Sequence, residues 1–116
     1  YEILRCLVGS EMCIRDSVLI LPKEHFDNIY ELDDETAAHV FKVAAKISKA
    51  YKKALDFDGL NIVQNNGEVA GQTVFHFHMH LIPRYKGDQV GITWHPGELS
   101  DADKEEILLK VKEQLS

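Results

Sequence analysis

The stretch Val74-Phe75-His76-Phe77-His78-Met79-His80-Leu81-Ile82-Pro83 decides the fold, because it places a histidine at every second position. Successive side chains of a β-strand point to opposite faces, so a strand here brings His76, His78 and His80 to one face. The bulky apolar residues between them then face the other way, toward a core. A helix would spread the same imidazoles over about 200° of its circumference. Proline has no backbone donor, so we expect Pro83 to end the strand pairing.

The row of histidines leaves three explanations open. Histidine has an unperturbed pKa of about 6.5, so near pH 7 it offers a neutral nitrogen that can attack phosphorus or bind a metal. The residues could therefore bind a metal, act on a phosphate or acyl group, or form a polar surface with no task. A merely solvated strand face is more easily made from threonine, lysine or glutamate, which disfavours the third explanation.

The polar segment before the histidines favours phosphate chemistry over a metal site. Its glycines, Gly71 among them, allow backbone conformations that let a ligand approach the main chain. Asn65, Gln72 and Thr73 offer neutral amide or hydroxyl groups that can hydrogen-bond phosphate oxygens. A catalytic zinc site would more often place a carboxylate or a further histidine here, and Glu68 is the one carboxylate in this segment.

Together these motifs resemble the histidine triad (HIT) family of nucleotide hydrolases and transferases, over the range from Val18 to Lys86. The His-φ-His-φ-His-φ-φ signature of that family stands at residues 76–82. The resemblance is supported by Leu19-Ile20-Leu21-Pro22-Lys23-Glu24-His25 and by the Gly-Gln-Thr sequence at residues 71–73. The combination resembles the bacterial members of the Hint-like branch, which contains purine nucleoside phosphoramidases and related nucleotidyl hydrolases.

The resemblance implies an α+β fold, in which an antiparallel sheet carries one long helix and a C-terminal helix. It implies an enzyme that cleaves at the α-phosphate of AMP or GMP conjugates, such as phosphoramidates or dinucleoside polyphosphates, through a nucleotidyl-histidine intermediate. The implied partners are a purine nucleotide or its conjugate and a second copy of the chain, because family members usually dimerise across the long helix and a sheet edge. We also expect a cytoplasmic location.

The predicted roles of the histidines follow from this chemistry. His78, in the middle, is the expected nucleophile that attacks the α-phosphorus. Its other ring nitrogen needs an acceptor, for which we predict the backbone carbonyl of His76. His80 is expected to contact the non-bridging oxygens or to support the transferred group, and the resemblance makes His25 a supporting histidine whose ring approaches the triad. The predicted catalytic residues are His78, His76 and His80, and the predicted nucleotide- and phosphate-binding residues are Asn65, Gly71, Gln72, Thr73 and His80.

Two other functions stay open on the sequence. A non-catalytic nucleotide-binding protein is one, because residues 1–17 lack the pattern that supplies base and ribose contacts in the family. A His-ligated metalloprotein is the other. Some bacterial family members hold a structural zinc through an N-terminal Cys-x-x-Cys and histidines that match His25 and His76. Cys6 and Cys13 lack that spacing, so we predict no metal and no other cofactor.

Composition limits the function further. A chain of 116 residues makes one domain. Its net charge of −6 and pI near 5.4 argue against binding to a nucleic-acid backbone, which needs a basic surface. No apolar run approaches the 18 or so residues that a membrane span needs.

The N-terminal segment fits the rest badly. Tyr1 to Val8 could form a short strand, but the stretch from Ser10 to Ser17 resembles adapter-derived sequence. We therefore interpret residues 1–17 as a fusion scar that is not native to the domain, and residues 18–116 as the HIT domain. The alternative is a divergent N-terminus.

Helix and strand signals fill the remaining chain. Asp33 is a good N-cap, and the apolar residues after it recur at helical spacing, which predicts an amphipathic helix of about 20 residues. Residues 60–65 alternate as a strand, which we expect to pair antiparallel with the histidine-bearing strand. Ser100 marks the start of a last helix, whose apolar stripe is Ile107, Leu108, Val111 and Leu115.

Overall fold

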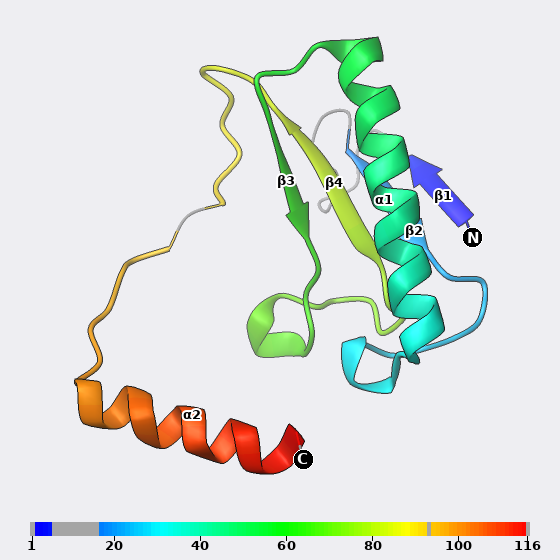
Figure 1. Cartoon of the computed structure of the whole chain (residues 1–116). Helices are drawn as coiled ribbons and strands as arrows, with labels where there is room; N and C mark the ends of the chain where they lie inside the picture. Colours follow the sequence, from blue (N-terminus) through cyan, green and yellow to red (C-terminus); the bar gives the residue numbers. More distant parts are fainter. Residues whose placement is uncertain (1, 6–16, 93, 116) are drawn as a thin grey trace.

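The structure, a computed structural model, describes residues 2–5, 17–92 and 94–115. The described strands form a four-stranded antiparallel sheet in the order β1-β2-β4-β3, with one long helix packed on it (Figure 1). This confirms the predicted α+β architecture. The strands are β1 (Glu2–Arg5), β2 (Val18–Leu21), β3 (Gly59–Val63) and β4 (Met79–Arg84); the helices are α1 (Asp34–Leu55) and α2 (Asp101–Leu115); the 3-10 turns are η1 (Ile29–Glu31) and η2 (Glu68–Ala70).

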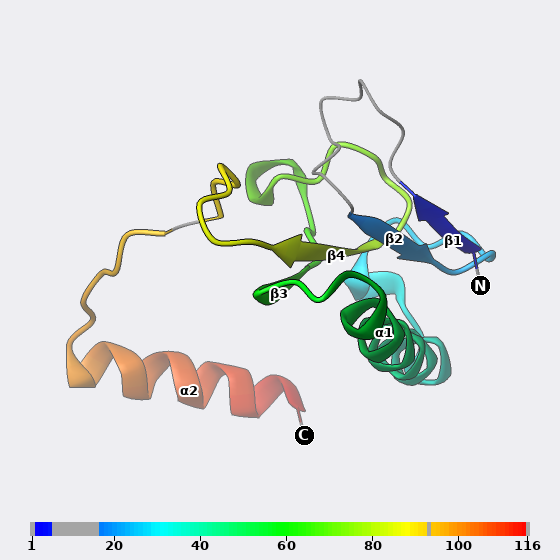
Figure 2. The ribbon, with the colours of Figure 1, turned by 90° about the horizontal axis from the view of Figure 1, so that it is seen from above.

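Helix α1 begins and ends where its sequence indicates. The Asp33 side chain accepts a hydrogen bond from the Thr36 N–H at 3.3 Å, as an N-cap does. Asp56 ends the helix in the left-handed conformation, with φ of 48°. The 22-residue length is close to the prediction. Figure 2 shows α1 covering one side of the sheet, with the β3–β4 connection on the other side.

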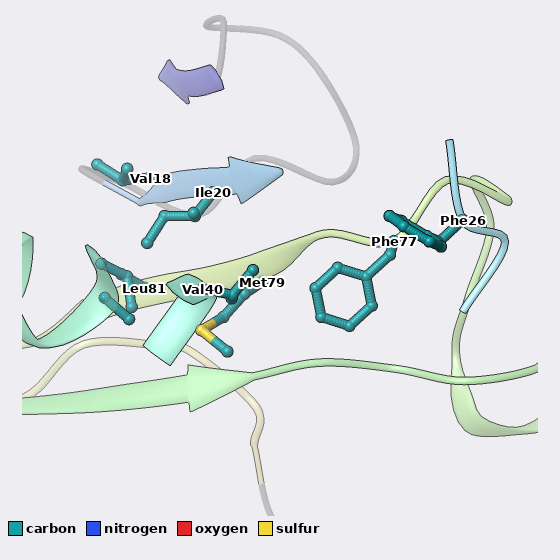
Figure 3. Packing of buried hydrophobic residues seen from close by; sticks show 8 residues of the cluster. Val18, Ile20, Phe26, Val40, Phe77, Met79 and Leu81 are labelled. Atoms are coloured by element: carbon teal, nitrogen blue, oxygen red, sulfur yellow. The ribbon is translucent and has the colours of Figure 1, made fainter. Parts of the chain in front are cut away.

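The hydrophobic core lies between α1 and this covered face of the sheet. Leu81 is 0% exposed and Val40 on the helix is 1% exposed. Burying one side chain of this size contributes about 1.5–3 kcal/mol. Because side chains alternate along a strand, the core positions Met79 and Leu81 turn His80 to the opposite face of β4. Figure 3 shows the packing of this core cluster, with labels on Val18, Ile20, Phe26, Val40, Phe77, Met79 and Leu81.

Strand β4 begins later than predicted. Its first residue is Met79, whereas the sequence pattern placed the start of the strand at Val74. The cause is the length of its neighbour: β3 ends at Val63, which pairs with His80, so the chain before this point has no β3 partner. The predicted antiparallel pairing of β3 with β4 is confirmed.

The expectation that Pro83 ends the strand pairing is wrong. Pro83 pairs with Leu60, and β4 continues to Arg84. The pairing of β2 with β4 covers only Met79 to Leu81. At the proline, the described strands therefore leave one side of β4 open, and a missing backbone donor on that side loses no hydrogen bond.

The chain leaves β4 through a clamped turn. The Arg84 guanidinium donates to both carboxylate oxygens of Asp88, at 2.9 Å each, and to the Asn61 side chain at 2.7 Å. The bidentate pair holds the pKa of Asp88 well below its usual range. Arg84 is therefore engaged within the protein, and the clamp fixes the direction in which the chain continues toward α2.

Helix α2 lies apart from the sheet and α1 in both views (Figures 1 and 2). It begins as predicted, because the Ser100 Oγ accepts a hydrogen bond from the Asp103 N–H at 3.1 Å. Its apolar stripe is not covered, since every residue of the helix is exposed. The radius of gyration is accordingly 16.7 Å, against about 13 Å for a compact domain of this length. Neither described helix is both long and apolar enough to span a membrane.

The N-terminal segment is described only in part. Strand β1 confirms the short strand predicted between Tyr1 and Val8, and it pairs antiparallel with β2. Residues 6–16, which include most of the stretch interpreted as a fusion scar, lie outside the described residues. We keep the foreign origin of residues 1–17 as a proposal. Reading the gene upstream of Val18 tests it, and an unbroken native frame there would contradict it.

Candidate active site

His78 and His80 stand side by side at the start of β4. Their ring centroids are 4.9 Å apart and the ring planes meet at 71°. The Nδ1 atom of His78 lies 2.7 Å from the His76 backbone oxygen, so the predicted hydrogen bond is present. A carbonyl can only accept, hence Nδ1 carries the hydrogen and Nε2 keeps a free lone pair. This contact gives His78 the tautomer that a nucleophile needs.

His80 is a neutral imidazole at physiological pH. Burial, together with the smaller effect of the neighbouring His78 ring, lowers the pKa of His80 from 6.5 to about 4. A neutral ring offers one N–H donor and one lone pair. His80 can therefore donate to a phosphate oxygen without adding a positive charge beside His78.

The ring of His76 serves a different neighbour. Its Nε2 lies 3.0 Å from the Pro22 carbonyl oxygen, and its Nδ1 lies 3.2 Å from Nδ1 of His25. The His25 and His76 ring centroids are 5.0 Å apart, so His25 does approach the triad as the resemblance implied. Because β4 starts only at Met79, residue 76 lies outside the regular pleat. The expected row of imidazoles therefore divides into a His78–His80 pair and a His25–His76 pair.

The contacts of His25 fix where its hydrogen atoms lie. The Pro22 carbonyl accepts from His76 Nε2, which leaves the neutral His76 ring accepting at Nδ1 from His25. The second nitrogen of His25 lies 2.6 Å from Oδ1 of Asp27, another acceptor. Sequence reasoning missed Asp27, because its contact with His25 leads to the site only through His76, 51 positions from His25.

The position of Gln72 differs from the one that its predicted phosphate contact requires. Its side chain is 2% exposed. The amide oxygen accepts from the Gly67 N–H at 2.8 Å, and the amide nitrogen donates to the carbonyls of Asp27 at 2.6 Å and Val74 at 3.1 Å. A phosphate would have to displace these bonds. In this structure Gln72 supports the loop, and its contact with phosphate stays a prediction.

Gly71 and Asn65 lie together, as a joint site requires. Gly71 has a φ of 100°, a conformation that favours glycine, and a Cβ there would meet the Asn65 Nδ2 at 3.2 Å. Thr73 is exposed two positions further along the chain. Their contacts with phosphate remain predictions.

Two loop segments, residues 22–31 and 64–78, carry most of these groups, and we call them the tied loops. The Ile29 N–H donates to the Asn66 side chain at 2.8 Å, and the Phe77 N–H donates to the Phe26 carbonyl at 2.6 Å. With the Gln72 bonds, these contacts join the two segments and hold His25, His76 and His78 outside the regular strand pairing.

The described residues do not fit a zinc site. His25 and His76 bring two ring nitrogens within 3.2 Å of each other, but a structural zinc takes four ligands. Among the residues that the structure describes, no group of three or more histidine, cysteine, aspartate or glutamate side chains is arranged to hold a metal ion. Cys6 and Cys13 lie outside the described residues.

Fold and site together define a histidine triad protein. The HIT domain family matches residues 15–87, and the chain belongs to that family. It is 43% identical over 101 residues to Protein hit of Bacillus subtilis, covering 84% of this chain and 70% of the relative. It is 35% identical over 105 residues to the adenosine 5'-monophosphoramidase of Candida albicans, covering 85% and 68%. The crystal structure of a HIT family protein from Bacillus anthracis superposes with a TM-score of 0.82 at 39% identity, over 89% of this chain and 75% of that one.

Proposed function

We propose that this protein hydrolyses AMP or GMP conjugates at the α-phosphate through a nucleotidyl intermediate on His78. The observation that carries the proposal is the 2.7 Å contact between His78 Nδ1 and the His76 carbonyl oxygen. It leaves the Nε2 lone pair available to a phosphorus atom. The proposed substrates are phosphoramidates or dinucleoside polyphosphates, and we place the reaction in the cytoplasm.

The reaction proceeds by two displacements at phosphorus. First the His78 Nε2 lone pair forms a bond to the α-phosphorus. The bond from phosphorus to the leaving group breaks with its electron pair on the leaving group, which takes up a proton from solvent; the water that attacks in the second displacement returns one proton to solvent. The His76 carbonyl, accepting from Nδ1–H, stabilises the positive charge that develops on the ring. Water then attacks the phosphorus, the P–Nε2 bond breaks, and nucleoside monophosphate leaves with neutral His78 restored.

Neighbouring groups support the transferred phosphoryl group. Neutral His80 can donate to a non-bridging oxygen, and the Asn65 amide and Thr73 hydroxyl are further candidate donors beside Gly71. Such donors assist because charge on the phosphate oxygens changes during each displacement. The similarity to a protein named adenosine 5'-monophosphoramidase supports a phosphoramidate as the first substrate to test.

The experiment is incubation with adenosine 5'-phosphoramidate, with AMP release and covalent labelling of the protein followed together. His78→Ala should abolish both labelling and turnover. His39→Asn, on helix α1, is the matched control and should keep both. Near-normal turnover by His78→Ala would reject the intermediate. AMP binding by the wild type without turnover would instead support the non-catalytic nucleotide-binding alternative.

We further propose a homodimer across α1 and the β3 edge of the sheet. Strand β3 is an edge strand among the described strands. Two apolar side chains here, Phe41 on α1 and Ile62 on β3, are 61% and 46% exposed. They line an apolar cavity of about 190 Å³ between α1 and β3. Sedimentation should show a dimer for the wild type and a monomer for Phe41→Asp; a monomeric wild type would contradict the proposal.

A further inference from the structure

We propose that Asp27 is a positioning residue, which sets the orientation of His78 through His25 and His76. The inference rests on the proposed function, because it assigns His78 as the reacting group. The carboxylate of Asp27 contacts His25, and it reaches His76 and His78 only through that ring.

The first step is that the Asp27 main chain is fixed from two sides. Its N–H donates to Oε2 of Glu31 at 2.9 Å, and its carbonyl accepts from Nε2 of Gln72 at 2.6 Å. These bonds connect the residue to η1 and to the β3–β4 connection. The surrounding loops therefore fix the main chain of Asp27, and its carboxylate then reaches His25.

The second step passes from the carboxylate to the His76 ring. Oδ1 of Asp27 lies 2.6 Å from Nε2 of His25, so the opposite nitrogen of the His25 ring points at His76, 3.2 Å away. The His76 ring is held at its other end by the Pro22 carbonyl at 3.0 Å. The ring thus has a partner on each nitrogen, and this fixes both its tautomer and its orientation.

The third step passes from His76 to the nucleophile. The backbone carbonyl of His76 accepts from His78 Nδ1 at 2.7 Å. If the His76 ring lost its partners, the main chain at residue 76 could turn and move this carbonyl. His78 would then lose the acceptor that keeps the hydrogen on Nδ1. The Asp27–His25 contact therefore helps to keep the lone pair of His78 on Nε2, the nitrogen proposed to attack phosphorus.

The competing explanation is an ordinary surface ion pair. The His25 and Asp27 side chains are 61% and 50% exposed, and pairs this exposed contribute little to folding stability. The two explanations therefore differ in one measurable respect. A positioning role changes turnover at unchanged stability, while a surface pair changes neither.

The experiment compares Asp27→Ala and Asp27→Asn with Glu24→Gln, which removes the same charge from the same segment. We expect Asp27→Ala to lower kcat about ten- to a hundredfold, the usual cost of removing a group that orients a functional histidine. KM and the melting temperature should stay near the wild-type values. Asp27→Asn should lose less, because its side-chain oxygen still accepts from His25.

A double variant tests the route. If Asp27 acts through His25, then adding Asp27→Ala to His25→Ala should cause no further loss of kcat, because residues in one network are not additive. Multiplicative losses, or an Asp27→Ala enzyme as active as Glu24→Gln, would overturn the proposal.

The ¹⁵N spectrum of the imidazoles separates this proposal from the proposed function. In the substrate-free wild type, His78 should show the Nδ1–H tautomer, and Asp27→Ala should shift it toward a mixture. If the wild type releases no AMP, the proposed function fails, and the spectra still decide the positioning role. Identical His76 and His78 signals in wild type and Asp27→Ala would overturn it.

Discussion

The tied loops bury a polar side chain, whereas helix α2 exposes apolar side chains. In the tied loops the polar Gln72 is 2% exposed, whereas in α2 the apolar Leu109 and Leu115 are 62% and 80% exposed. Gln72 is buried at little cost because its amide has three hydrogen-bond partners. The α2 side chains are exposed because no described residue covers them. Hydrogen-bond partners therefore explain why the polar Gln72 side chain is buried, and missing neighbours explain why the apolar α2 side chains are exposed.

The two regions also differ in the contacts that keep them ordered. Hydrogen bonds between distant segments hold the tied loops in one arrangement before any ligand binds, and such preorganisation is what stabilises charge in a transition state. Helix α2 is held by local hydrogen bonds and by ion pairs within the helix, and a helix of this length is marginal in water without packing. We expect the site to be rigid and α2 to be the least protected helix.

The largest expected effect is on Gln72. Gln72→Ala leaves the Gly67 N–H and the Asp27 carbonyl, both half-buried, without their partner. Each unsatisfied group costs about 1–3 kcal/mol, so we expect a loss of about 3 kcal/mol in the free energy of unfolding, measured by urea titration. The matched variant is Leu109→Ala in α2, which should change stability by less than about 0.5 kcal/mol. Equal losses would show that the two regions do not differ in packing.

A smaller effect comes from the titration of His80. Its folded-state pKa of about 4 is below the ordinary 6.5, so between these values the unfolded chain binds more protons than the folded one. Stability should therefore be full above pH 6.5 and fall as the pH drops to about 4, by about 2 kcal/mol in all once the partial solvent exposure of His80 is taken into account. Urea titrations across this range test it. His80→Asn should remove this part of the slope, while His95→Asn, at an exposed position, should keep it.

Local signals predicted the helices and the strand pairing. The start of α1 depends on Asp33 and the residues directly after it, and the pairing of β3 with β4 depends on two short alternating runs. The start of β4 was mispredicted because it depends on where β3 ends. Pro83 was misjudged for a similar reason, since the cost of its missing donor depends on whether β2 reaches that far.

The site could be predicted only as far as its residues act locally. The bond from His78 to the His76 carbonyl spans two positions, and the sequence was sufficient to predict it. Gln72 reaches a carbonyl 45 positions away, and a glutamine beside a glycine indicates nothing about such a partner. Asp27 was missed because its proposed role depends on the contact between His25 and His76, which are 51 positions apart in the chain.

The smallest effect on global stability is expected for α2, and hydrogen exchange measures it directly. Ion pairs such as Lys110–Glu106, at 3.1 Å, support this helix, but each contributes only about 0.2–0.5 kcal/mol. Its amides should be protected less than about tenfold, while the amides of α1 exchange only on global unfolding. Removing residues 100–116 should leave the free energy of unfolding within about 0.5 kcal/mol of the wild type. Protection of α2 that rises with protein concentration would contradict this, because it would mean that Ile107, Leu108 and Val111 are covered by a second copy of the chain.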